Sequence, residues 1–264
     1  MMSDWLHDLP LVWMALTVLG GTCLVTAAIY AGVMALATGE RARTFKAMSP
    51  GMLPPLGIIF GLFIAFTAAQ VWNDTDRAAV AVGREANALS GVLFLAASFP
   101  GEPEAQMRKL VRDYIEVVAT QGWPRMAQQR GQLGVTPQPI ADALKLALAQ
   151  TPATEGQEIA QREIIIALGN TLEARRQRIM VSESQVNAVK WSCLLVQAIC
   201  MLIGIAMVHC DNRRTAAIAM GLFGAGVAVS VMLILAHDRP FTGKISIGPD
   251  TLLQVMPEIE TGRH

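Results

Sequence analysis

The chain has 264 residues, 53% of them hydrophobic, and its 21 basic residues equal its 21 acidic ones. Such a balanced charge gives no indication of nucleic acid or of an acidic substrate as a partner. With charged residues at only 16%, the long apolar runs indicate an integral membrane protein instead.

Four of these apolar runs are long enough to cross a bilayer. They cover about Leu11–Leu36, Leu53–Trp72, Trp191–His209 and Thr215–His237. A helix needs roughly 20 apolar residues to cross the hydrocarbon core. The sequence therefore predicts an all-α membrane protein with four transmembrane helices.

The second run continues without a helix breaker into a charged segment. We therefore predict one unbroken helix from Leu53 to about Phe99. Proline and glycine then separate further helical pieces. These pieces are predicted at Glu104–Gln121, at Ile140–Gln150, and from Gln157 straight into the third span.

The predicted organisation has four parts. Residues 1–72 hold spans one and two, residues 73–189 a soluble helical stalk domain, residues 190–237 spans three and four, and residues 238–264 a tail. In the tail, Lys244–Ile247 is predicted as a short extended strand and Thr251–Met256 as a short helix.

The sequence shows no catalytic constellation. It has no nucleophile elbow, no phosphate-binding glycine loop and no pair of metal ligands at helical spacing. We therefore expect no enzyme, no cofactor and no metal. The spans also carry no ionisable residue at depth, which a proton-driven transporter would ordinarily need. A pore lined by apolar residues can gate by dewetting, so the spans favour a channel over a pump.

One face of the second span is a candidate pore neck. Pro54, Ile58 and Leu62 repeat every four residues, and Phe66 continues the row. Around an oligomer axis these side chains would form the rings of a narrow hydrophobic constriction. The alternative is that the same face packs against neighbouring helices.

Polar residues beyond that neck are candidates for a wider vestibule. They are Thr67, Gln70, Asp74, Arg84 and Glu85, together with Asp76 and Arg77 where the helix enters water. A solvated helix face is the alternative for all of them, and an ion pair between subunits is a second alternative for Arg84 and Glu85. Their mixed charges do not decide between anions and cations.

Several short motifs resemble an uncharacterised bacterial family, the bestrophin-like membrane proteins. They are Phe66–Trp72, Ala78, Arg84–Leu89, Tyr114, Trp123–Met126, the tail motif Asp238–Gly243, Ile247 and Pro249. The tail motif is the most specific of them, and the resemblance covers most of the chain from Leu53 to Met256.

The resemblance implies a fold and a function. Bestrophins are pentameric ion channels with four spans, a helical domain between spans two and three, and a neck contributed by span two. Asp238, Pro240, Phe241 and Gly243 would then fix the tail against the stalk near the membrane border. The acidic cluster that binds calcium in animal bestrophins is missing after Gly243, so calcium gating is not implied.

The sequence thus predicts a homo-oligomer, a pentamer, in the bacterial inner membrane, which conducts small ions passively through an axial pore lined by span two. Two alternatives remain open: a non-conducting scaffold or sensor, and a stator-like proton channel that needs a partner subunit. Arginines on both sides of the spans leave open whether the soluble domain is cytoplasmic or periplasmic.

Overall fold

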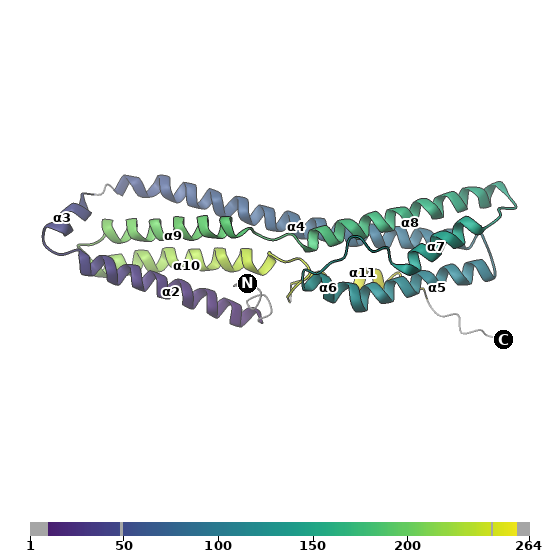
Figure 1. Cartoon of the computed structure of the whole chain (residues 1–264). Helices are drawn as coiled ribbons and strands as arrows, with labels where there is room; N and C mark the ends of the chain where they lie inside the picture. Colours follow the sequence, from purple (N-terminus) through teal and green to yellow (C-terminus); the bar gives the residue numbers. More distant parts are fainter. Residues whose placement is uncertain (1–9, 48–49, 244, 258–264) are drawn as a thin grey trace. The chain divides into compact units, whose positions relative to one another are not determined.

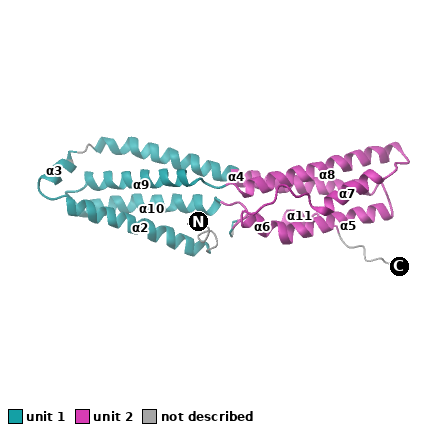
Figure 2. Cartoon of the chain, viewed as in Figure 1, with its two compact units in different colours: residues 1–73, 185–238, 243–245 teal, residues 74–184, 239–242, 246–264 magenta. Residues whose placement is uncertain are grey.

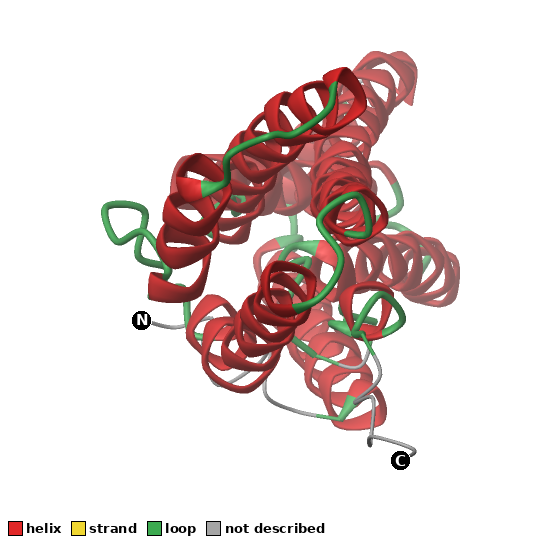
Figure 3. Ribbon diagram, turned by 90° about the vertical axis from the view of Figure 1, so that its right-hand side faces the viewer, coloured by secondary structure: helices red, strands yellow, loops and turns green. Residues whose placement is uncertain are grey.

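The computed structural model describes residues 10–47, 50–243 and 245–257. Within these ranges all regular secondary structure is helical (Figures 1 and 3). The chain divides into two compact units (Figure 2). Unit 1 comprises Met1–Asn73, Gln185–Asp238 and Gly243–Ile245, and unit 2 comprises Asp74–Ser184, Arg239–Thr242 and Ser246–His264.

Unit 1 holds the apolar helices. Its elements are α2 (Leu11–Leu36), α3 (Glu40–Lys46), η1 (Pro50–Met52), the first part of α4 (Leu53–Ala96), α9 (Ala188–Val208) and α10 (Arg213–His237). Four helices, α2, α4, α9 and α10, are long and apolar enough to cross a membrane. The four predicted spans are therefore present as helices.

Apolar side chains hold the helices of unit 1 together. Helix α2 lies along α10 and α9 (Figure 1), and at Gly224 an added Cβ would lie only 2.8 Å from Thr26 Oγ1. A small residue there permits the close approach of the two helices. Elsewhere Phe60 of α4 packs on Phe223 of α10 with ring centroids 5.5 Å apart, beside Leu194 of α9.

Unit 2 is built from the second part of α4 and shorter amphipathic helices. These are α5 (Glu102–Val117), the single π-helical turn η2 (Val118–Gly122), α6 (Trp123–Ala127), α7 (Gln138–Ala149), α8 (Glu155–Ser182) and α11 (Asp250–Leu253). Their apolar faces share one core, which includes Leu89, Val92, Val111, Ile115, Ile140, Ile164 and Leu168. Figure 1 shows α8 running beside the second part of α4.

Polar contacts fix the start of α8. The Thr154 side chain caps the helix by accepting a hydrogen bond from the Gln157 backbone N at 3.2 Å. The side chain of Gln157 in turn donates to the Ser98 carbonyl oxygen at 2.9 Å. The start of α8 is thereby tied to the segment that follows α4.

The predicted continuous helix from span two into the charged segment is confirmed, since α4 runs unbroken for 44 residues. The prediction that the helix from Gln157 continues into the third span is wrong. Helix α8 ends at Ser182, and α9 begins at Ala188.

Side-chain acceptors explain this break. Asn187 caps α9 by accepting from the backbone N of Val189 at 2.8 Å, and Asp238 Oδ1 accepts from the backbone N of Val186 at 2.7 Å. These side chains offer the backbone an alternative to helical hydrogen bonds. The predicted strand at Lys244–Ile247 is not observed either: residues 245–247 are irregular, and Lys244 lies outside the described residues.

Candidate functional site

The face of α4 predicted as a neck is open in the folded chain. Ile58 is 70% exposed, Leu62 54% and Phe66 67%, and Pro54 is exposed as well. The opposite face of α4 carries Phe60 and other residues that pack against α9 and α10. No other described part of the chain covers the predicted neck, which leaves it open to lipid, to a neighbouring copy or to the water of a pore.

The same face continues beyond the neck. At 100° per residue, it passes through residues that are exposed throughout. We call this row the α4 stripe; it consists of Ile58, Leu62, Phe66, Ala69, Asn73, Asp76, Val80, Arg84 and Asn87. It is apolar from Ile58 to Ala69 and largely polar from Asn73 onward.

Two of the predicted vestibule residues are buried instead. The hydroxyl of Thr67 is on the packed side of α4 and donates to the Phe63 carbonyl oxygen at 2.8 Å. Glu85 is completely buried. By helical periodicity both residues lie opposite the α4 stripe. The prediction that Thr67 and Glu85 face open water is therefore wrong for the folded chain.

Gln70 and Asp74 are half-buried and have partners within the chain. Gln70 Oε1 accepts a hydrogen bond from the Lys190 ammonium, and Asp74 Oδ2 accepts from the Ser184 hydroxyl at 2.8 Å. Of the predicted vestibule residues, Asp76 and Arg84 lie on the stripe. Asn73 and Asn87, which were not predicted for the vestibule, follow from extending the helical repeat past Phe66.

A buried polar cluster forms the second notable feature, inside unit 2. Arg178 of α8 holds the Glu85 carboxylate with two hydrogen bonds, Nε to Oε2 at 2.7 Å and Nη2 to Oε1 at 3.0 Å. Tyr114 of α5 donates its hydroxyl to the same carboxylate. This is an intrachain pair, so Glu85 does not supply a bond between subunits. Paired and hydrogen-bonded in this way, a buried charge is tolerated.

Burial and neighbouring charges shift the pKa values of Tyr114 and Arg178 in this cluster. Burial raises the pKa of Tyr114 well above its usual value, and the neighbouring Glu85 carboxylate adds to this effect. Burial disfavours the charged form of Arg178, but Glu85 and Tyr114 outweigh it, and the pKa of Arg178 is raised. At neutral pH Tyr114 is therefore a protonated phenol and Arg178 a cation.

The tail motif packs against the same cluster. The Arg178 guanidinium carbon lies 4.5 Å from the centre of the Trp123 ring, a cation–π contact. Trp123 meets Phe241 edge to face, with centroids 5.9 Å apart, and its Nε1 donates to the Ile247 carbonyl oxygen at 2.9 Å. The tail chain turns at Gly243, whose φ of +90° suits glycine.

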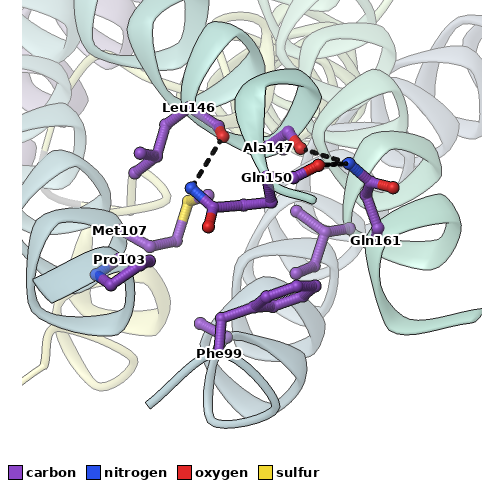
Figure 4. A pocket seen from close by; sticks show the side chains of 9 residues that line it. Phe99, Pro103, Met107, Leu146, Ala147, Gln150 and Gln161 are labelled. Carbon is purple, nitrogen blue, oxygen red and sulfur yellow. Dashed lines mark hydrogen bonds between the residues drawn. The ribbon is translucent and has the colours of Figure 1, made fainter. Parts of the chain in front are cut away.

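A small gap near α5 and α7 does not form a site. Figure 4 shows Phe99, Met107 and Gln150 around it. Its volume is about 10 Å³, at most the room of a single water molecule. Among the described residues no three His, Cys, Asp or Glu side chains gather into a metal site.

Together these features define an all-helical membrane protein with four apolar spans and a helical unit built around a buried ion pair. The Bestrophin-like domain family model matches residues 20–252, which is most of the chain. The chain belongs to the bestrophin-like family, and the resemblance inferred from its motifs is confirmed.

A crystal structure of a mutated bacterial bestrophin homologue from Klebsiella pneumoniae has a similar fold. The TM-score is 0.66 at 11% sequence identity, and the match covers 93% of this chain and 97% of the homologue. At this identity the likeness shows the fold alone. No curated protein matches the chain.

Proposed function

We propose that the chain forms an oligomeric ion channel whose axial pore is lined by the α4 stripe. The observation that carries this proposal is the stripe itself, one exposed face that changes from large apolar to polar residues along a single helix. Membership of the bestrophin-like family supports it. Ions would pass without chemical conversion, so no catalytic group is required.

In this mechanism Ile58 and Leu62, with Pro54 at the mouth and Phe66 beyond, form the constriction. Rings of such side chains exclude water when narrow and admit hydrated ions when the helices move apart. Asn73, Asp76, Arg84 and Asn87 would line the wider polar part. Since these include one acidic and one basic residue, they assign no ion preference.

A single α4 cannot enclose a pore, so the proposal requires several copies around one axis. We infer a homo-oligomer, a pentamer as in the bestrophins, in the bacterial inner membrane. Unit 2 would then serve as the helical stalk domain. Its water-facing polar residues and its own core suit it to a position outside the bilayer.

Exposure alone also fits contact with lipid, and this favours a second candidate, a non-conducting scaffold. Ile218 and Leu222 of α10 are 64% and 72% exposed, as open as the proposed neck. They have the same residue types and spacing as Ile58 and Leu62. The α10 pair is therefore a matched control for the α4 pair.

The test is planar-bilayer current from the purified full-length chain. Widening the neck with Ile58→Ala and Leu62→Ala is expected to raise the unitary current or alter ion preference, while Ile218→Ala with Leu222→Ala leaves both unchanged. If the wild type passes no current while folded and assembled, the scaffold replaces the channel. If both double variants change current equally, α4 does not line the pore.

A further inference from the structure

A second cavity lies within unit 2, away from the α4 stripe. It has a volume of about 130 Å³ and is bounded by the π-helical turn η2, by the loop before α7 and by α8. A π-helical turn inserts an extra residue into a helix and frequently marks a functional position. Here it presents Val118 and Gly122 to the cavity.

The charged side chains that line this cavity are cationic. Arg125 of α6 and Arg175 of α8 line it, and among the described residues no acidic side chain does. Arg178 also reaches it, but its charge is matched by Glu85. Neither Arg125 nor Arg175 has a carboxylate within ion-pair distance in the described part of the chain. The cavity therefore holds excess positive charge.

Arg175 is the better placed of the two. It is half-buried, and its Nη2 donates to the Gln132 carbonyl oxygen at 3.2 Å, which holds the guanidinium at the cavity wall. Burial lowers the pKa of Arg175, because a desolvated cation lacks full compensation. A guanidinium keeps its proton in proteins, so an anion entering the cavity would supply that compensation.

Apart from the amides of Gln121 and Gln132, the rest of the wall is apolar. Val118 and Ile179 are buried beside the cavity, and Val135 and Pro137 of the loop cover it from the other side. An inorganic anion would leave this surface without a partner. A carboxylate with an apolar body would use both the planar fork of an arginine and the apolar wall.

We propose that this cavity binds a small organic carboxylate, held by Arg175 and Arg125 with its apolar part against Val118 and Ile179. The proposal concerns a binding site in unit 2 and does not depend on conduction. A cavity of about 130 Å³ limits the ligand to the size of a single ring or a short chain.

The test uses 4-fluorobenzoate and the full-length protein in detergent, read by fluorine NMR against a detergent blank. The neutral 4-fluorobenzamide and inorganic phosphate serve as comparison probes. We expect saturable binding of the benzoate that the benzamide does not reproduce, and weak competition by phosphate. Equal binding of benzoate and benzamide, phosphate as effective as benzoate, or no saturable binding would each overturn the proposal.

Variants locate the site. Arg175→Gln is expected to weaken benzoate binding about tenfold or more, as loss of a charge-assisted hydrogen bond implies. The matched control is Arg176→Gln, the exposed neighbour that does not line the cavity, which should leave affinity unchanged. If Arg175→Gln does not fold, benzoate binding is measured with Arg125→Gln instead, because this variant replaces an exposed side chain. Equal affinities in Arg125→Gln and Arg176→Gln would then refute the site.

Discussion

The two parts of α4 use one helix in opposite ways. In unit 1 the helix leaves Ile58, Leu62 and Phe66 open, while in unit 2 it buries Leu89 and the Glu85 carboxylate completely. The first part thus exposes large apolar side chains, which are unfavourable in water. The second part buries a carboxylate, which is unfavourable in apolar surroundings. One helix can do both only if its two parts have different surroundings.

The comparison shows where each part obtains its stability. In unit 2 the chain satisfies its own polar groups, as Arg178 and Tyr114 do for Glu85. In unit 1 the exposed face of α4 makes few contacts within the chain, so its surroundings in the assembled protein come from outside the chain. Substitutions in the buried cluster should therefore change folding, and substitutions on the open face should change function.

Breaking the buried ion pair is expected to have the largest effect. Arg178→Met leaves the Glu85 carboxylate buried without its cation, and should lower the free energy of unfolding by about 3–5 kcal/mol. Chemical denaturation in detergent measures it. The exposed control Arg176→Met should change stability by less than about 0.5 kcal/mol. A loss equal in both variants would show that the pair does not organise unit 2.

Removing the phenol should cost less. Tyr114→Phe deletes a buried hydrogen bond to a charged acceptor and should lower stability by about 2 kcal/mol. The pKa of Tyr114 is raised in the folded chain, so its contribution is complete below the unfolded pKa of about 10 and falls as pH rises above it. The variant should therefore lose less stability than the wild type above pH ~10. Parallel melting curves against pH would contradict this.

The tail contact should be weaker again. Phe241→Leu keeps an apolar side chain but removes the edge-to-face contact with Trp123, and should cost about 1 kcal/mol. Because the chain has five tryptophans, Trp123 fluorescence is followed in a background where the other four are replaced by phenylalanine. The exposed Phe94, which has 81% of its surface open, provides the control: Phe94→Leu should leave both stability and fluorescence unchanged.

Substitutions on the open face of α4 should change the free energy of unfolding least. Ile58→Ala with Leu62→Ala removes side chains that make few contacts within the chain, so the monomer fold should lose less than about 1 kcal/mol. Circular dichroism in detergent and thermal unfolding check this. A large loss of helix content would mean that this face packs inside the folded chain.

Periodicity and hydropathy could predict much of the fold. The spans and the unbroken α4 follow from them, as does the shared face of Ile58 and Leu62, because these depend on neighbours within a few turns. The break between α8 and α9 could not be predicted, since one of its determinants, Asp238, lies 52 residues from Val186. Local pattern carries no information on such distant acceptors.

The expectation that Glu85 is exposed is wrong for a related reason. Glu85 reads as an exposed charge because its neighbours Arg84 and Ala86 give no sign of a partner. Its cation, Arg178, lies 93 residues away. The two asparagines that share the open face, Asn73 and Asn87, could have been found by carrying the helical repeat of Ile58 and Leu62 further.

The central claim is that the open face of α4 meets water and ions in the assembled protein. It is tested most directly by thiol accessibility at Leu62→Cys, in a background without the native Cys23, Cys193, Cys200 and Cys210. Leu222→Cys on α10 is the matched control.

A membrane-impermeant anionic thiol reagent is applied while current is recorded. The account predicts that the reagent changes the current through Leu62→Cys and leaves that through Leu222→Cys unaltered. Unchanged current in both, with Leu62→Cys unreacted, would contradict it and place this face of α4 in lipid.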